Sequence, residues 1–524
     1  MMKRRKRKPE ADSGRTPDRP VAPERYRMRA AGLIAIGIAT AVIVGLKLRS
    51  PAGKADAAAA YVSRQKGHLT FNKNIAPIVF HNCAPCHRPG QAAPFNLLNY
   101  EDARKRAKQI MEVTQRRYMP PWLPEHGYGD FADERRLSVG EIGMIRQWVA
   151  EGAMEGQAAD LPPLPKWTEG WELSQPDLIV TPPTAYALAP DGLSWVLEPN
   201  SDLLLQVHMH PTGKPETVQP SVGFYFSDKP ATNTPYRINL LRYAIDIPPG
   251  AGEYAVENRY LLPVDVDLLR ISPHTHYLGK ELQSYAILPG GSRKWLILIK
   301  NWDFNWQGDY RYAEPVFLPK GTTLVMHFTY DNSADNVHNP NQPPKRVRFG
   351  LQTTDEMAEL GLQLLPRNPG ERETLARDFF VKFTKDAVEE NEALLRVNPN
   401  DAARQMKLGT ALFMLGRVSE TLDHLRAAVQ LRPDDDQAHY QLGSLYLHQN
   451  QFEAARAEFE TVLRLKPDDF QASGSLGYIF LRQRNLDRAR LYLENALRIN
   501  PDDPIARANF ERVRKAKEVS GKQN

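Results

Sequence analysis

The chain has 524 residues, enough for roughly three or four domains, and 42% of them are hydrophobic, which is ordinary for a folded protein. Its formal net charge is +6, but residues 1–29 alone carry eleven Lys or Arg against four acids, so the rest of the chain is close to neutral. A nucleic-acid-binding surface needs basic residues clustered on the folded part. The charge distribution therefore excludes nucleic acid as a partner.

An uncharged apolar run follows the basic segment. Residues 30–46 are about long enough to cross a bilayer core, and the basic residues before them predict that 1–29 stay in the cytoplasm. We expect a single-pass anchor, with the bulk of the chain on the exported (periplasmic) side of a bacterial inner membrane. A cleaved signal peptide is the alternative, because the small residues at 57–60 offer a cleavage site.

The two cysteines of the chain lie in one pentad, Cys83-Ala84-Pro85-Cys86-His87. A C-x-x-C-H pentad is the attachment signature of a c-type haem, in which both thiols bond the porphyrin and the histidine becomes an axial iron ligand. A redox C-x-x-C and half of a zinc site are the alternatives, but no second cysteine pair exists to complete a zinc cage. The pattern therefore predicts covalent haem on Cys83 and Cys86, with His87 on the iron.

Helical signals recur around this pentad, at 75–80, 100–115 and 138–151. They predict an all-α domain at 71–160. The sixth iron ligand is usually a methionine, and Met119 is the best candidate because two prolines follow it; His126 is a weaker rival. Met111 and Met144 have helical spacing and are expected in the core. The domain resembles class I cytochrome c modules that are fused to larger bacterial enzymes.

Residues 170–365 contain many prolines and short alternating strands separated by turn signals, which predicts an all-β sandwich. Two H-x-H pairs stand out there, His208 with His210 and His274 with His276. Residues two apart on a strand project from the same face, so each pair can offer two imidazoles to one metal. Buried histidines satisfied by hydrogen bonds are the alternative interpretation.

The sequence HTHYLGK at 274–280, followed by TTDEM at 353–357, resembles the catalytic half of the type II copper, ascorbate-dependent monooxygenases. That family includes peptidylglycine alpha-hydroxylating monooxygenase and dopamine beta-monooxygenase. The resemblance implies that His274, His276 and Met357 hold the catalytic copper. Two imidazoles bind both copper oxidation states, while a soft thioether favours Cu(I), the state that must meet dioxygen.

The family's second copper site is only partly present. Its Leu-Gln-Val-His strand matches 205–208, so the resemblance implies His208 as a ligand, with His210 as a possible supplement. The adjacent His-His pair of the family is missing, since no histidine lies between His126 and His208. We expect a shortened first lobe with an incomplete second copper site.

Prolines and glycines recur at a 34-residue interval near the C-terminus: Pro399, Pro433, Pro467 and Pro501, and Gly409, Gly443 and Gly477. This period is typical of tetratricopeptide repeats. In such a repeat the glycine lets two antiparallel helices approach closely, and the proline ends the second helix. We expect an α-solenoid whose groove binds a protein or peptide partner; a role only in orienting the neighbouring domain is the alternative.

Together these patterns predict a multidomain, membrane-anchored haem and copper oxidoreductase. The main hypothesis is a dioxygen-dependent copper monooxygenase that receives electrons from its own cytochrome c domain, with an external electron donor and a small-molecule substrate. The alternative is a non-catalytic, haem-bearing assembly or electron-transfer protein that binds a partner through its repeats. The expected segments are a basic tail at 1–29, an anchor at 30–48, a tether at 49–70, a cytochrome c domain at 71–160, a shortened first copper lobe at 170–245, a second copper lobe at 246–365, a helical linker at 371–398 and tetratricopeptide repeats at 399–518.

Overall fold

The computed structural model describes residues 61–167 except 90 and 92, residues 178–180, 193, 222–224 and 226, and residues 233–521. The expected tail and anchor, and most of the first copper lobe with His208 and His210, lie outside these residues. Within the part of the chain that is described, no helix combines the length and apolar character needed to cross a membrane.

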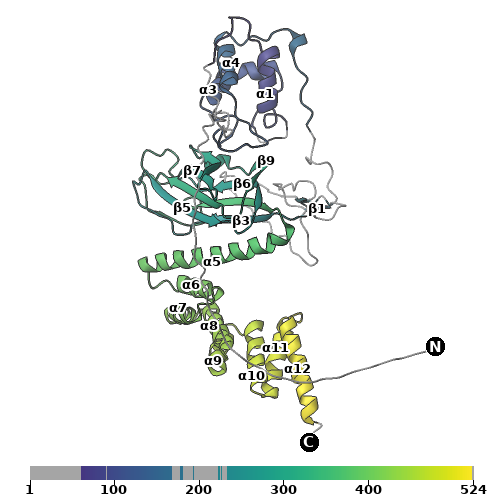
Figure 1. The fold of residues 1–524 in the computed structure, drawn as a ribbon, viewed down its shortest axis with the longest axis vertical. Coiled ribbons are helices and arrows are strands. Elements are labelled where there is room, and N and C mark those ends of the chain that lie inside the picture. Colours follow the sequence, from purple (N-terminus) through teal and green to yellow (C-terminus); the bar gives the residue numbers. More distant parts are fainter. Residues whose placement is uncertain are drawn as a thin grey trace, which may run out of the picture. The chain divides into compact units, whose positions relative to one another are not determined.

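The first described part of the chain is a small helical domain (Figure 1), and the two cysteines follow its helix α1. Its elements are η1 (Phe71–Ile75), α1 (Ala76–Asn82), α2 (Tyr100–Lys105), α3 (Ala107–Gln115), α4 (Val139–Ala150) and the short turn η2 (Ala158–Asp160). Phe71 and Trp148 lie at the centre of its core, and Met111 and Met144 pack against that core as expected. Helix α4 begins at a capping box, in which Ser138 and Glu141 bond each other's backbone. All three predicted helical segments are present, although the one at 100–115 forms two helices.

Two contacts change the expected limits of this domain. Residues 61–70, which we had expected in the tether, pack on α4: the Tyr61 hydroxyl donates to Gln147 Oε1 at 2.6 Å, and Leu69 is buried. At the other side, residues 122–133 leave the helices and join the β domain, where Phe131 lies in the sandwich core and bridges to Tyr312 of β9. The helical domain is therefore not the self-contained unit that 71–160 implied.

The middle of the chain is an antiparallel β sandwich, as predicted. One sheet has the order β3-β12-β6-β9 and the other β5-β10-β7-β8. Their strands are β3 (Tyr236–Leu241), β5 (Tyr254–Leu261), β6 (Val266–His274), β7 (Gly279–Ile287), β8 (Arg293–Ile299), β9 (Tyr310–Leu318), β10 (Thr323–Tyr330) and β12 (Glu359–Pro366). Alternating inward side chains, such as Leu362 on β12 and Phe328 on β10, form one core between the sheets.

Smaller elements complete the β region: β1 (Leu178–Val180) pairs with β2 (Val222–Phe224), β4 (Asp246–Ile247) pairs with β11 (Val347–Arg348), and η3 (Phe304–Trp306) is a single turn before β9. Strand β3 pairs with β12 along its whole length. The sandwich therefore begins before residue 246, where we had placed the start of the second lobe. That pairing joins segments more than a hundred residues apart, so local sequence patterns do not indicate it.

Helix α5 (Arg372–Val397), preceded by the short turn η4 (Pro369–Glu371), lies along the sandwich and is the segment expected at 371–398. Leu375 and Phe379 enter the sandwich core, and the Phe379 ring packs edge-on against Tyr260 at 5.1 Å between centroids. This helix is thus part of the β domain's packing as well as the lead into the repeats.

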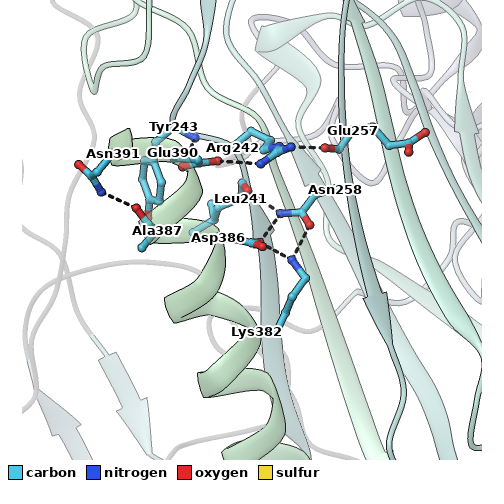
Figure 2. A network of polar contacts seen from close by, with 10 residues as sticks. All are labelled: Leu241, Arg242, Tyr243, Glu257, Asn258, Lys382, Asp386, Ala387, Glu390 and Asn391. Carbon is cyan, nitrogen blue, oxygen red and sulfur yellow. Dashed lines mark hydrogen bonds and ion pairs between the residues drawn. The ribbon is translucent and has the colours of Figure 1, made fainter. Parts of the chain in front are cut away.

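Polar contacts hold the second half of α5 to the sheet edge (Figure 2). The buried Glu390 accepts the Tyr243 backbone N–H at 2.9 Å and contacts the Arg242 guanidinium at 3.4 Å. One turn earlier, Asn258 donates to Asp386 at 2.9 Å and accepts from Lys382 at 2.7 Å. Burial raises the pKa of Glu390 to about 7, although the bond from Tyr243 acts in the other direction.

The C-terminal part forms three antiparallel helix pairs and a final helix (Figure 1). The elements are α6 (Ala402–Met414), α7 (Val418–Leu431), α8 (Asp436–His448), α9 (Phe452–Leu465), α10 (Phe470–Arg482), α11 (Leu486–Ile499) and α12 (Pro504–Gly521). The recurring glycines lie where each pair approaches closely; a Cβ on Gly477 would lie 2.5 Å from Leu493 Cγ. Pro433, Pro467 and Pro501 each follow the end of a second helix. The prediction of a helical repeat array is confirmed.

Candidate cofactor and metal sites

A cavity of about 340 Å³ lies beside the cysteines, within the size range of small-molecule sites. The pentad residues Cys83, Cys86 and His87 line it, and so does Met119 from the loop after α3. Most of the remaining lining is apolar: Ala93, Pro94, Phe95, Leu97, Ile110 and Val113. The structure therefore brings the four residues predicted to hold a haem around one apolar cavity.

The turn after α1 orients the pentad. The backbone N–H groups of Cys86 and His87 both bond the Cys83 carbonyl, at 3.1 and 2.9 Å. His87 Nδ1 lies 3.1 Å from the Phe95 carbonyl oxygen, which can only accept, so Nδ1 carries the proton and Nε2 keeps its lone pair. Burial lowers the pKa of His87 and favours the neutral ring. A neutral imidazole with a free Nε2 is the form that an axial iron ligand needs.

Cys83 lacks the lowered pKa of a redox-active cysteine. Burial raises the pKa of its thiol to about 12. Reactive C-x-x-C motifs have the opposite property, a lowered pKa that supplies a thiolate. No group of three or more His, Cys, Asp or Glu side chains that could hold a metal occurs in the described ranges, which gives the half-zinc-site alternative no support.

The cavity lining also includes polar and charged side chains: His81, Asn82, Gln109, Thr114 and Arg135. Trp306 from turn η3 of the β domain lines it as well. The Trp306 indole N–H is buried and has no hydrogen-bond partner in the described residues, whereas buried donors are normally paired. A cation and an open donor suit the carboxylate groups of a haem. His126, the rival iron ligand, is exposed, lies 3.4 Å from Glu134 and is not among the lining residues.

The two copper-type motifs come together at one end of the sandwich. His274 is the last residue of β6 and pairs in register with Glu359 of β12, two residues after Met357. The rings of His274 and His276 lie 5.3 Å apart between centroids, at 82° to each other. Strand pairing thus places the D-E-M segment beside the H-T-H segment, and the backbone N–H groups of His276 and Met357 bond the same carboxylate oxygen of Glu356.

A buried carboxylate, Glu356, ties these motifs together. Its Oε1 accepts the Thr275 hydroxyl at 2.6 Å, the Met357 N–H at 2.8 Å and the His276 N–H, while Oε2 accepts the Leu278 N–H at 3.0 Å. Glu356 and Thr275 are fully buried. Burial raises the pKa of Glu356 to about 7, whereas the four donors favour the carboxylate, which alone can satisfy all of them.

Outer contacts orient both imidazoles. His274 Nδ1 lies 2.5 Å from Gln307 Oε1, and His276 Nδ1 lies 3.1 Å from the Asp355 carbonyl oxygen. Trp302 Nε1 donates to the His276 carbonyl at 3.0 Å. These carbonyl acceptors place the ring protons on Nδ1. Burial lowers the pKa of His276, although its backbone hydrogen bonds to Asp355 and Gln352 act in the other direction. Imidazole and thioether groups are donor types that suit copper.

A second, open pocket of about 590 Å³ lies beside the haem-type cavity and shares Tyr118 and Trp306 with it. Trp302 and Asp303 form its wall on the β-domain side, and His338 also borders it. Trp302, which lines this pocket, also donates its indole N–H to the His276 carbonyl. The pocket is large enough for a small molecule.

His327 lies on β10 within an otherwise apolar stretch, yet it is not part of the core. Its side chain is one-third exposed and faces Glu257, with Nδ1 3.6 Å from a carboxylate oxygen. The residue lies on the outer face of its strand, between Met326 and Phe328, both of which are fully buried. His338 is exposed, as expected for its polar loop.

The sequence motifs alone did not identify several residues of these sites. Glu356 and Thr275 are the central residues of the D-E-M and H-T-H motifs, and that shared central position is a signal that could have identified them. Gln307 and Trp306 carry no comparable signal, because they lie in a short turn whose position depends on the strands around it. Their contacts come from the folded sandwich.

The comparison with protein families gives a match in the C-terminal part of the chain. A tetratricopeptide repeat family model matches residues 383–436 and 440–504. Among solved structures, YrrB, described as a TPR protein with an unusual peptide-binding site, is 26% identical with a TM-score of 0.23; the match covers 24% of this chain and 64% of YrrB. MamA from Desulfovibrio magneticus RS-1 is 21% identical with a TM-score of 0.25, over 26% of this chain and 76% of MamA.

The first TPR of Spaghetti (RPAP3), solved with an HSP90 peptide, is 18% identical with a TM-score of 0.22, over 22% of this chain and 93% of that one. No curated protein matches the chain. The repeat assignment rests on the family model together with the observed helix pairs. The C-terminal part of this chain is a tetratricopeptide repeat domain.

Proposed function

We propose that this protein is a membrane-anchored oxidoreductase that carries a covalent haem c and one copper. The observation that carries the proposal is the apolar cavity lined by Cys83, Cys86, His87 and Met119. Cys83 and Cys86 would bond a haem covalently through their thiols, and His87 and Met119 would hold its iron.

At the other site, His274, His276 and Met357 would hold copper. When bound, that copper would supply the one-electron chemistry that activates dioxygen for hydroxylation of an aliphatic C–H bond. Glu356 holds the two motifs together, and Gln307 and the Asp355 carbonyl set the ring orientations. His208 and His210 stay a proposed, incomplete second copper site. The pocket beside Trp302 is the proposed place for a small-molecule substrate.

The tetratricopeptide repeats indicate interaction with another protein. We propose a protein or peptide partner there, and an external electron donor for the haem. The same repeats favour a second candidate, a non-catalytic haem protein that assembles or exchanges electrons with a partner. For location we propose a bacterial inner-membrane anchor at 30–48, with the bulk of the chain on the exported side.

The test is the cofactor content of the full chain, purified after expression with cytochrome c maturation. We expect one covalent haem per chain, lost in Cys83→Ala and in Cys86→Ala, and a copper content closer to one than to two per chain. His274→Ala should remove copper and leave haem. Haem staining that survives in both cysteine variants would refute the haem assignment. A chain that holds haem but no copper would instead favour the second candidate.

A further inference from the structure

The turn η3 touches both proposed cofactor sites. Trp306 lines the haem-type cavity and packs edge-on against Tyr118 at 6.0 Å between ring centroids. Two residues earlier, the Phe304 ring lies 5.6 Å from the His276 ring. One residue after the turn, Gln307 holds His274. Within these four residues, Trp306 therefore contacts the cavity, while Phe304 before it and Gln307 after it contact the copper-type histidines.

Local hydrogen bonds make this turn rigid. Asp303 caps it by accepting the Asn305 N–H at 2.9 Å, and its backbone carbonyl accepts the Trp306 N–H at 3.0 Å. The Gln307 side-chain amide donates back to the Phe304 carbonyl at 3.0 Å. The Phe304 ring is packed on its other side by Tyr277 at 4.7 Å. The two aromatic rings are thus held at fixed positions relative to each other and to His276.

We propose that η3 is the path by which an electron passes from the haem cavity to the copper site, entering at Trp306 and reaching His276 through Phe304. This inference rests on the proposed function, since it requires both cofactors. Electron transfer slows steeply as the gap between donor and acceptor widens. The Trp306 indole forms part of the cavity wall, and the Phe304 ring lies against His276. Only Asn305 separates the two residues in the chain, so a short stretch of backbone joins these two contacts.

The step that the turn would serve moves one electron and no atom or proton. Iron(II) in the cavity and copper(II) at the histidines give iron(III) and copper(I). The reducing equivalent comes from the external electron donor already proposed for the haem. The packing between the helical and β domains is consistent with this path. Phe131, in the segment after Met119, packs into the core of the sandwich that also carries η3.

The experiment uses the full chain in detergent, with haem attached and copper(II) added, under anaerobic conditions. A flash-generated reductant reduces the haem, and its absorbance follows reoxidation while the copper(II) EPR signal follows copper reduction. In Phe304→Leu and in Trp306→Leu we expect reoxidation to slow by about tenfold or more. Trp295→Leu is the control, since Trp295 packs on Tyr128 and Tyr285 and away from η3.

Haem content, haem potential and the copper(II) EPR signal are measured in every variant, so that a damaged site is distinguished from a broken path. Phe304→Leu is the more informative variant, because Phe304 does not line the haem-type cavity and its replacement leaves the cavity wall intact. Absence of haem or copper in the unmodified protein would overturn the proposed function and this inference with it. With both bound, unchanged rates in the two variants, or slowing in Trp306→Leu alone, would reject only the path.

Discussion

Replacement of Glu356 by glutamine tests whether this side chain holds the copper-type motifs together. Four donors converge on its two oxygens, from Thr275, His276, Leu278 and Met357. A glutamine keeps one oxygen and turns the other into an NH₂ donor. In the better orientation the NH₂ group faces the Leu278 N–H, which leaves that buried donor unpaired at a cost of about 1–3 kcal/mol.

The expected result is faster hydrogen exchange in peptides covering 270–280 and 350–360. An opening free energy lowered by about 1.4 kcal/mol corresponds to roughly tenfold faster exchange. Copper affinity should fall by about 10–100-fold, the usual effect of losing an outer contact that orients metal ligands. Glu359→Gln removes the same charge three residues further on and should change neither quantity. Unchanged exchange in Glu356→Gln would refute the assigned role of Glu356.

Three further predictions concern other parts of the chain. Burial raises the pKa of Glu390 in the folded protein to about 7, from an ordinary 4.5. Its contribution to stability is therefore fully present below pH 4.5 and is lost as the pH rises through 7. Glu390→Gln should flatten this decline, which hydrogen exchange of the α5 amides at several pH values would measure. Gly477→Ala should destabilise the repeats by about 1–3 kcal/mol through its clash with Leu493, while Gly474→Ala, whose Cβ would meet nothing closer than 4.0 Å, should stabilise them by about 1 kcal/mol in thermal unfolding. Met119→Ala should keep covalent haem but lose the weak absorption band at the red edge of the oxidised spectrum, and persistence of that band would mean that another residue ligates the iron.

Features with a short or regular spacing could be predicted from the sequence. The pentad Cys83–His87 is one, because the proposed haem would need both thiols and the imidazole as near neighbours in the chain. The repeats are another, because each helix pair uses the same contact between a glycine and a large apolar residue, as Gly477 and Leu493 do, and therefore returns every 34 residues. The alternation of the strands likewise predicted the sandwich.

Contacts between distant segments could not be predicted in this way. Thr275 and Glu356 are separated by 81 residues, and their bond forms because β6 pairs with β12 in one register. Phe131 joins the core of a domain that begins a hundred residues later, and Trp306 reaches a cavity lined by residues of the helical domain. Strand register and domain packing depend on the burial of many side chains together. The position of Trp306 and Phe304 between the two proposed sites therefore follows from the tertiary structure and could not be predicted from a local sequence pattern.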